Sequence, residues 1–460
     1  MTTHEADAAQ DPRPAAPVRI RPRERDALLQ SLRAGVVPRV GQQHVQVGRV
    51  AEVRAMLADV ERIADGGSAL RFVIGDYGAG KTFFLHLVRS IAMEKRLVTA
   101  HADLNPDRRL HATGGQARGL YAELMRNLAS RSKPDGGALP GVVERFVSTA
   151  LAEAERTGET PDQVIRSRMR HLSELTGGYD FAEVVGAYWR GHDSGDEHLK
   201  SAAVRWLRGE YATRTDARAA LGVRTIIDDG TMYDHLKLMS RFVRLAGFDG
   251  LLICADEMVN LYKLASTRAR NANYEQILRI LNDTLQGSTG HLGFLFGGTP
   301  EFLRDSRRGL FSYPALQSRL ADNAFAADGL VDLTGPVLEL QPLTQEDFYV
   351  LLTKLRHVHA GGDAGAHVLP DEAVMAFMRH CSEKIGDAYF RTPRTTIMAF
   401  CDLLAVLEQN PGTDWQSLVG SVTLAPEQNP DLAPLDEDDP DDDPPPGDPQ
   451  RDDDFTTFKL

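Results

Sequence analysis

Gly75-Asp76-Tyr77-Gly78-Ala79-Gly80-Lys81-Thr82 is the stretch of sequence that decides the fold. It matches the pattern G-x-x-x-x-G-K-[ST], the P-loop or Walker A motif, in which glycines let backbone N–H groups curve around phosphate oxygens. An apolar run over residues 69–74 precedes it and is typical of a buried parallel strand. Apolar residues at helical spacing follow it, from Phe84 to Ala92. The succession of strand, loop and helix predicts an α/β fold built on a parallel sheet flanked by helices.

The residues of this loop have distinct expected roles. The Lys81 ammonium is expected to reach the β- and γ-phosphates of a nucleotide, and the Thr82 hydroxyl to bind Mg²⁺. The alternative interpretation is a tight strand–helix turn with an incidental lysine. The residues expected to contact the nucleotide here are Gly75, Asp76, Tyr77, Gly78, Ala79, Gly80, Lys81, Thr82 and Phe83.

A second apolar stretch, residues 251–255, ends in the two carboxylates Asp256 and Glu257, as a Walker B strand would. Open α/β sheets bind ligands at the carboxyl ends of their strands. We therefore expect Asp256 to complete the Mg²⁺ site with Thr82, and Glu257 to orient or deprotonate an attacking water. The pair favours hydrolysis, because a small-molecule kinase needs no water-activating glutamate. A strand that ends in a solvated acidic loop is the alternative.

The order of these motifs resembles the AAA+ ATPase family, and the resemblance implies further site residues. Val47-Gly48-Arg49 resembles the N-terminal box near the adenine, so Gly48 and Arg49 are expected to contact nucleotide. Thr299, at the end of the strand-like run 294–298, resembles the polar sensor that reports the γ-phosphate. A strand that simply ends in a Gly-Gly turn is the alternative there.

Two arginines complete this resemblance. Arg319 resembles the arginine finger that one subunit of an oligomer presents to its neighbour's nucleotide, with Arg307 and Arg308 as competitors. Arg394, after Pro393 at the start of a helix, resembles the second sensor, with Arg391 as the alternative. Each could equally be a solvated surface arginine.

A closer resemblance covers about residues 34–404. The stretches that carry it are Gly35-Val36-Val37-Pro38, Val47-Gly48-Arg49, the P-loop with Phe83, Asp256-Glu257-Met258-Val259-Asn260-Leu261-Tyr262-Lys263, Gly298-Thr299-Pro300-Glu301-Phe302 and Arg308-Gly309-Leu310. They are similar to the BrxD-type ATP-binding proteins of the BREX and Pgl phage-exclusion systems. The resemblance implies an ATPase that serves as a motor or switch in antiphage defence, with ATP and Mg²⁺ as ligands and other defence proteins as partners.

Two other functions remain open from the residues alone. The first is an AAA+ ATPase of the replication-initiator or transposition-regulator type. The second is a nucleotide-dependent scaffold with negligible hydrolysis, against which Glu257 argues. Oligomerisation follows from the arginine finger, and DNA contact is a hypothesis that rests mainly on the family. The basic residues of the insertion have acids interleaved, which favours a mixed-charge surface; they are Arg108, Arg109, Arg118, Arg126, Arg131 and Lys133.

Composition divides the chain into four expected regions. These are a disordered N-terminus (1–25), an ATPase core (26–335) with a helical insertion at about 106–244, a helical lid (336–420) and a disordered acidic tail (421–460). Of the net charge of −13, residues 431–460 carry −10 with twelve acids and two bases, so the rest carries only −3. The charge of the body therefore does not exclude a nucleic-acid partner.

Several classes of protein are excluded by composition. No apolar run approaches the roughly 18 residues that a membrane span needs, and the N-terminus lacks a signal-like apolar stretch. The three cysteines, Cys254, Cys381 and Cys401, lie far apart and form neither a disulfide framework nor a zinc spacing. We expect a cytoplasmic protein with no membrane partner and no metal beyond Mg²⁺.

Overall fold

The computed structural model describes residues 19–323, 325–326, 332–385 and 393–421, and it is built on a five-stranded sheet. The strands lie in the order β2-β3-β4-β1-β5, and every pairing is parallel. They are β1 (Ser68–Ile74), β2 (Val98–Asp103), β3 (Leu251–Asp256), β4 (Leu292–Gly298) and β5 (Val337–Glu339). The prediction of a parallel α/β sheet is confirmed. β5 lies beyond residue 335, so the sheet continues past the expected end of the core.

The register of the sheet brings the two sequence motifs to one edge. Ile74, the last residue of β1, pairs with Gly298, and Asp103 pairs with Asp256. The central strands β1, β3 and β4 are apolar and buried along nearly their whole length, as parallel strands covered on both faces must be. Because parallel strands end together, the P-loop after β1 and the acid pair of β3 become neighbours.

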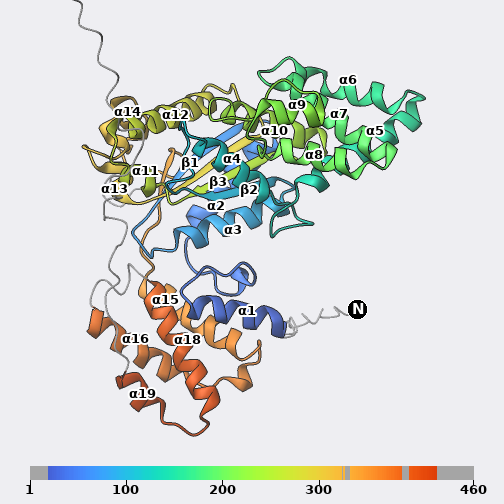
Figure 1. Cartoon of the computed structure of the whole chain (residues 1–460). Helices are drawn as coiled ribbons and strands as arrows, with labels where there is room; N and C mark the ends of the chain where they lie inside the picture. The colour runs from blue at the N-terminus through green and yellow to red at the C-terminus, as the bar shows by residue number, and fades with distance from the viewer. Residues whose placement is uncertain (1–18, 324, 327–331, 386–392, 422–460) are drawn as a thin grey trace, which may run out of the picture.

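Helices cover both faces of this sheet (Figure 1). α2 (Val50–Ala64) and α3 (Lys81–Glu94) pack on one face, with Phe84 and Val88 of α3 against Cys254 and Leu295. α4 (Gln116–Arg126), α10 (Met232–Leu245) and α12 (Thr267–Leu285) pack on the other. The buried stripes follow the apolar spacing of the sequence.

The helical insertion projects from the sheet as an arm (Figure 1). Its remaining helices are α5 (Leu139–Thr157), α6 (Pro161–Ser173), α7 (Gly178–Ser194), α8 (Glu197–Leu207) and α9 (Arg214–Leu221). The apolar spacing predicts α4, α5, α7, α8 and α10, but α6 and α9 are additional. α6 begins with a capping box, in which the Thr160 side chain accepts from the Gln163 backbone and the Gln163 side chain accepts from the Thr160 backbone.

The C-terminal helices form a second core that includes the first helix of the chain. α15 (Gln345–His359), α16 (Asp371–Ile385), α18 (Pro393–Gln409) and α19 (Trp415–Ser421) make up this lid. α1 (Pro22–Arg33) buries Leu28 and Leu32 among them, and it lies beside them in Figure 1. The sequence places α1 in the ATPase core, whereas its apolar face packs in the lid.

Some expectations fall outside the described residues. Residues 1–18 and 422–460, which contain nearly all of the segments expected to be disordered, lie outside them, and so does Arg391. None of the helices in the described ranges has an apolar stretch sufficient to span a lipid bilayer.

Two neighbouring histidines, His86 on α3 and His101 on β2, make the stability of the fold depend on pH. Burial, together with the positive charge of Arg89, lowers the pKa of His86 to about 4 and that of His101 to about 3, from an ordinary value of 6.5. Their ring centroids lie 5.9 Å apart. Since the unfolded chain takes up protons first, stability is complete above pH 6.5 and falls as the pH decreases toward 4.

We expect the urea midpoint to drop between pH 7.5 and 5, with each histidine contributing about 1–2 kcal/mol. His101→Asn should flatten this dependence, whereas His198→Gln, at an exposed position on α8, should leave it unchanged. Equal pH dependence in both variants would contradict the assignment.

Candidate functional site

The P-loop is held in a turned conformation between β1 and α3. Gly80 has φ +86° directly before the helix, a region in which side chains other than glycine are strained. The Gly75 amide donates to the Gly298 carbonyl at 3.2 Å, which anchors the start of the loop to β4. Lys81 Nζ donates to the carbonyls of Gly75 (2.9 Å) and Asp76 (3.0 Å), so its side chain folds back over the loop.

A hydrogen bond joins the P-loop motif after β1 to the acidic motif at the end of β3. The Thr82 hydroxyl donates to Asp256 Oδ2 at 2.6 Å, and Asp256 Oδ1 accepts from the Glu257 amide at 2.9 Å. Asp256 is only 6% exposed, so its carboxylate is fixed. Gly297 of β4 provides the room, because a Cβ there would lie 2.1 Å from Asp256 Oδ1.

This oxygen pair fits a hard divalent cation. Mg²⁺ prefers oxygen ligands and takes one or two protein ligands beside water and phosphate oxygens. Thr82 and Asp256 supply one hydroxyl and one carboxylate at adjacent positions. Among the described residues, no group of three or more His, Cys, Asp or Glu side chains is arranged to hold a metal without such additional ligands.

Glu257 occupies a strained backbone conformation at the wall of the site. Its φ is +58°, a value that costs a non-glycine residue about 1–2 kcal/mol. The Met258 amide donates to the Gly297 carbonyl at 3.0 Å, which holds the backbone after β3 in place. The side chain of Glu257 is exposed and lines the cavity, whereas that of Asp256 is buried. Neighbouring acids thus point to different environments and can carry different roles.

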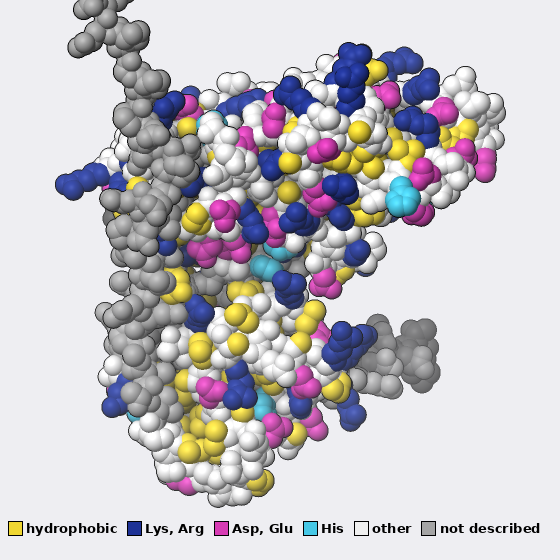
Figure 2. Space-filling model, in the orientation of Figure 1, with side chains coloured by type: hydrophobic (Ala, Val, Ile, Leu, Met, Phe, Trp, Pro, Cys, Tyr) yellow, Lys and Arg dark blue, Asp and Glu magenta, His cyan; other side chains and the backbone are white. Residues whose placement is uncertain are grey.

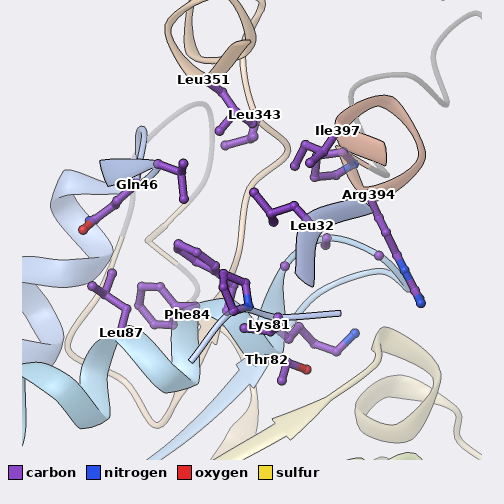
Figure 3. A pocket seen from close by; sticks show the side chains of 18 of the residues that line it. Leu32, Gln46, Lys81, Thr82, Phe84, Leu87, Leu343, Leu351, Arg394 and Ile397 are labelled. Carbon is purple, nitrogen blue, oxygen red and sulfur yellow. The ribbon is translucent and has the colours of Figure 1, made fainter. Parts of the chain in front are cut away.

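A cavity of about 290 Å³ lies between the P-loop and the lid. In Figure 3, Lys81 and Thr82 line one side, Leu343, Leu351 and Ile397 approach from the lid, and Leu32 of α1 lies between them. The other apolar residues of the wall are Val36, Val37, Pro38, Val45, Val47, Phe83, Phe84 and Leu87. One side of the cavity is therefore a polar phosphate-type cradle, and the other is suited to a flat apolar group.

Gly48 and Arg49 join the loop to the lid. Arg49 Nη2 donates to the Ala79 carbonyl of the P-loop at 2.6 Å, and burial lowers the pKa of its guanidinium. Gly48 has φ +60°, and a Cβ on it would lie 3.0 Å from Asp347 Oδ1 at the start of α15. Arg49 lines the cavity, and Gly48 precedes it where the chain passes under the lid.

Arg394 reaches the P-loop from α18. Its Nη1 donates to the Tyr77 hydroxyl at 3.2 Å, and the residue lines the cavity. Pro393 is the first residue of α18, where its missing N–H costs nothing. The fold thus brings Arg394 to the site from more than 300 positions away in sequence.

Thr299 lies near the site but is not part of the cavity wall. It is 2% exposed, and its side chain accepts from the Phe302 amide at 3.4 Å as the cap of α13 (Pro300–Arg304). The preceding residue, Gly298, is the one that contacts the P-loop amide.

The three candidate finger arginines differ in their surroundings. Arg319 is exposed on α14 (Pro314–Leu320), and its Nη1 donates to the Ala315 carbonyl of its own helix at 2.8 Å. Arg307 is also exposed. Arg308 instead donates to the carbonyls of Lys263 and Leu264 and lies over the Tyr262 ring. Its side chain therefore has a structural role within its own subunit. None of the three lines this molecule's own cavity.

The apolar residues that the lid and α1 contribute are the part of the site that the sequence motifs do not include. Leu32, Leu343, Leu351 and Ile397 have no signature beyond ordinary helical or loop apolar residues. A weak signal existed in Gly35-Val36-Val37-Pro38, which forms part of the resemblance described above and lines the wall.

Comparison with known proteins gives one family. A search of curated proteins found no match. The family model described as "BREX system ATP-binding protein BrxC/D" matches residues 20–423, which includes every element of the site. The match confirms the family resemblance carried by the motifs and favours it over replication initiators. The chain therefore belongs to the BrxC/D family of BREX system ATP-binding proteins.

Proposed function

We propose that this protein binds Mg·ATP in the cavity between the P-loop and the lid and hydrolyses it to ADP and phosphate. The observation that carries the proposal is the 2.6 Å hydrogen bond between Thr82 and Asp256, with Glu257 next to it on the cavity wall. That arrangement supplies a phosphate cradle, an oxygen pair for a cation and a carboxylate within one site.

The proposed roles follow from the positions of these side chains. Lys81 leaves the loop carbonyls and neutralises charge on the phosphates, while Thr82 and Asp256 hold Mg²⁺, which when bound neutralises charge on phosphate oxygens. Glu257 orients the attacking water and accepts its proton. Arg394 contacts the γ-phosphate end from the lid, and the apolar wall with Gly48 and Arg49 receives the adenine side. Thr299 acts indirectly, because it follows Gly298, whose carbonyl accepts a hydrogen bond from the Gly75 amide of the P-loop.

The arginine finger is proposed to act between subunits. Arg319 is exposed and absent from its own cavity, which fits presentation to a neighbour's nucleotide in a homo-oligomer. Arg319→Ala is expected to lower turnover about 10³-fold or more at concentrations where the protein is oligomeric. Arg307→Ala is the matched variant, because Arg307 is also exposed and lies only a short distance away along the chain. Normal hydrolysis by Arg319→Ala would exclude it as the finger, and loss in Arg307→Ala instead would transfer the role.

The wider setting is an inference from family membership. We propose a motor or switch in a BREX-like antiphage complex, acting in the cytoplasm with other defence proteins and on or near DNA. Its organisation would comprise an ATPase core with a helical insertion, and a lid built from α15 to α19 together with α1.

The experiment that tests the function measures ATP turnover against protein concentration, with and without duplex DNA. Turnover that rises more steeply than linearly with concentration supports catalysis shared between subunits. Stimulation by DNA supports action near DNA. Nucleotide binding with no turnover at any concentration would contradict hydrolysis and favour the scaffold alternative.

A further inference from the structure

A second cavity lies at the end of the sheet opposite to the P-loop. Its volume is about 440 Å³, and it is bordered by the end of α3, the turn at residues 131–132 after the isolated bridge between Thr99 and Ala129, α5, and the turn before β3. The residues that line it are Met93, Arg96, Leu97, Arg131, Ser132, Arg145, Gly247 and Phe248. The six residues of β2 separate this cavity from Thr82 and Asp256, the proposed Mg²⁺ ligands. The length of the strand is about 20 Å at roughly 3.3 Å per residue.

The charged side chains of the wall itself are all basic. Three of the described residues that line it are arginines, two in turns and one on α5, and none is an Asp or Glu. Arg96 and Arg131 each have a carboxylate partner outside the wall, Asp249 at 3.4 Å and Glu94 at 3.2 Å. Both ion pairs are at least partly exposed and therefore weak, and Arg96 Nη2 also donates to the Gly247 carbonyl at 3.0 Å. A guanidinium has five N–H donors, so both arginines retain donors for a phosphate.

Arg145 adds a flat surface to the charge. Its guanidinium lies over the Phe248 ring, 4.9 Å from the centroid, and no carboxylate among the described residues pairs with it. The backbone of Gly247 passes close by, with φ +83°, and a Cβ there would lie 3.5 Å from Arg145 Nη2. The stacked pair offers a flat face to a nucleobase, and the buried side chains of Met93 and Leu97 form the apolar base of the cavity.

We propose that this cavity binds a nucleotide unit, with phosphate oxygens on Arg96 and Arg131 and the base against the Arg145–Phe248 pair. A planar guanidinium can donate two hydrogen bonds to the oxygens of one phosphate, and an aromatic ring can stack on any base. The proposed site therefore recognises a nucleotide without preference for the base. The unit comes either from a nucleic-acid strand or from a free nucleotide, which share this chemistry.

The basic residues of the insertion, for which the sequence favours a mixed-charge surface, are mostly engaged elsewhere. Arg109 is 7% exposed, Arg108 pairs with Glu123, Arg126 pairs with Glu210, and Arg118 donates to the Tyr211 carbonyl. Figure 2 shows Lys and Arg interspersed with Asp and Glu over the visible face of the arm. Of these residues Arg131 lines the cavity, and its ion pair with Glu94 is the most exposed of those named here.

The test measures fluorescence anisotropy of a labelled 20-nucleotide single strand on the full chain at about 50 mM salt, without free nucleotide, which would compete for the proposed cavity. The variant replaces Arg96, Arg131 and Arg145 by alanine. Its control replaces Arg166, Arg170 and Arg218, three exposed arginines of α6 and α9, and so removes the same charge. We expect at least a tenfold loss of strand affinity in the first variant and less than twofold in the control. We also expect the salt slope of the first variant to be smaller by about two counterions.

A second arm separates the two sources of the nucleotide unit. ADP is titrated by calorimetry into Lys81→Ala, whose P-loop site is disabled. If free nucleotide is the ligand, residual binding should remain, and it should disappear when the three arginine substitutions are added to Lys81→Ala. Strand binding without this residual signal assigns the site to nucleic acid. Equal losses in the two triple variants, or no binding of either probe, would overturn the proposal. ATP turnover of the triple variant without nucleic acid should be unchanged, so failure here leaves the proposed hydrolysis untouched.

Discussion

Glu257→Gln is expected to bind ATP with unchanged affinity and to lose turnover by about 10²–10⁴-fold, the range that a positioned general base contributes. The amide keeps the size and position of the side chain but cannot accept the proton of the attacking water. The phosphate cradle, the cation pair and the lid wall are all unaltered by the change. Binding is measured with a fluorescent ATP analogue, and turnover by phosphate release.

The adjacent acid provides the contrast to this variant. Asp256→Asn should lower both turnover and the apparent affinity for Mg²⁺. Asp256 is buried and accepts a hydrogen bond from the Thr82 hydroxyl, so the substitution removes the negative charge from the proposed cation site. A Mg²⁺ titration therefore distinguishes the two carboxylates. If Glu257→Gln turns ATP over at a tenth of the normal rate or faster, the base is another group.

Gly297→Ala is expected to lower turnover by about 10²-fold with little change in the far-ultraviolet spectrum. A Cβ at residue 297 would lie 2.1 Å from Asp256 Oδ1, so the carboxylate must leave the position in which it accepts from the Thr82 hydroxyl. Displacement of a reacting constellation by about 1 Å can cost this much rate, and the overpacking itself costs roughly 1–3 kcal/mol of stability. The Mg²⁺ concentration for half-maximal turnover should rise in parallel.

Gly293→Ala is the matched control on the same strand and the same face. A Cβ there would meet Ile63 Cδ1 at 2.3 Å and Leu252 Cδ1 at 3.0 Å, which are ends of apolar side chains far from the acid pair. Its melting temperature should fall, while turnover per folded molecule stays near normal. Similar turnover losses in both variants would show that strain in β4, and not displacement of Asp256, lowers the rate.

The polar half of the site could be predicted from sequence because its signals are local. Thr82 and Asp256 each stand in a short motif next to an apolar strand, and strands in a parallel sheet end at one edge. The topology then brings the two within hydrogen-bond distance. Arg394 needed the family resemblance as well, since nothing in Thr392-Pro393-Arg394 points to a partner as distant as Tyr77.

The apolar half could not be predicted, because it depends on which surfaces pack together. Leu32 and Ile397 read as ordinary residues of amphipathic helices, and only the contact between α1 and α18 turns them toward the same cavity. The strand β5, Val337–Glu339, is three residues long and too short to show an alternating pattern. Its place beside β1 follows from the pairing with Phe72 to Ile74, which the segment itself does not encode.

The inclusion of α1 in the lid has a mechanical consequence. Two separate covalent connections join the lid to the sheet, residues 34–49 after α1 and residues 340–344 after β5. A domain connected at two points rotates most easily about the line that joins them. Both connections also contribute residues to the wall of the cavity: Val36 and Val37 from the first, and Leu343 from the second. Whatever fills the cavity therefore contacts both connections between the lid and the sheet at once.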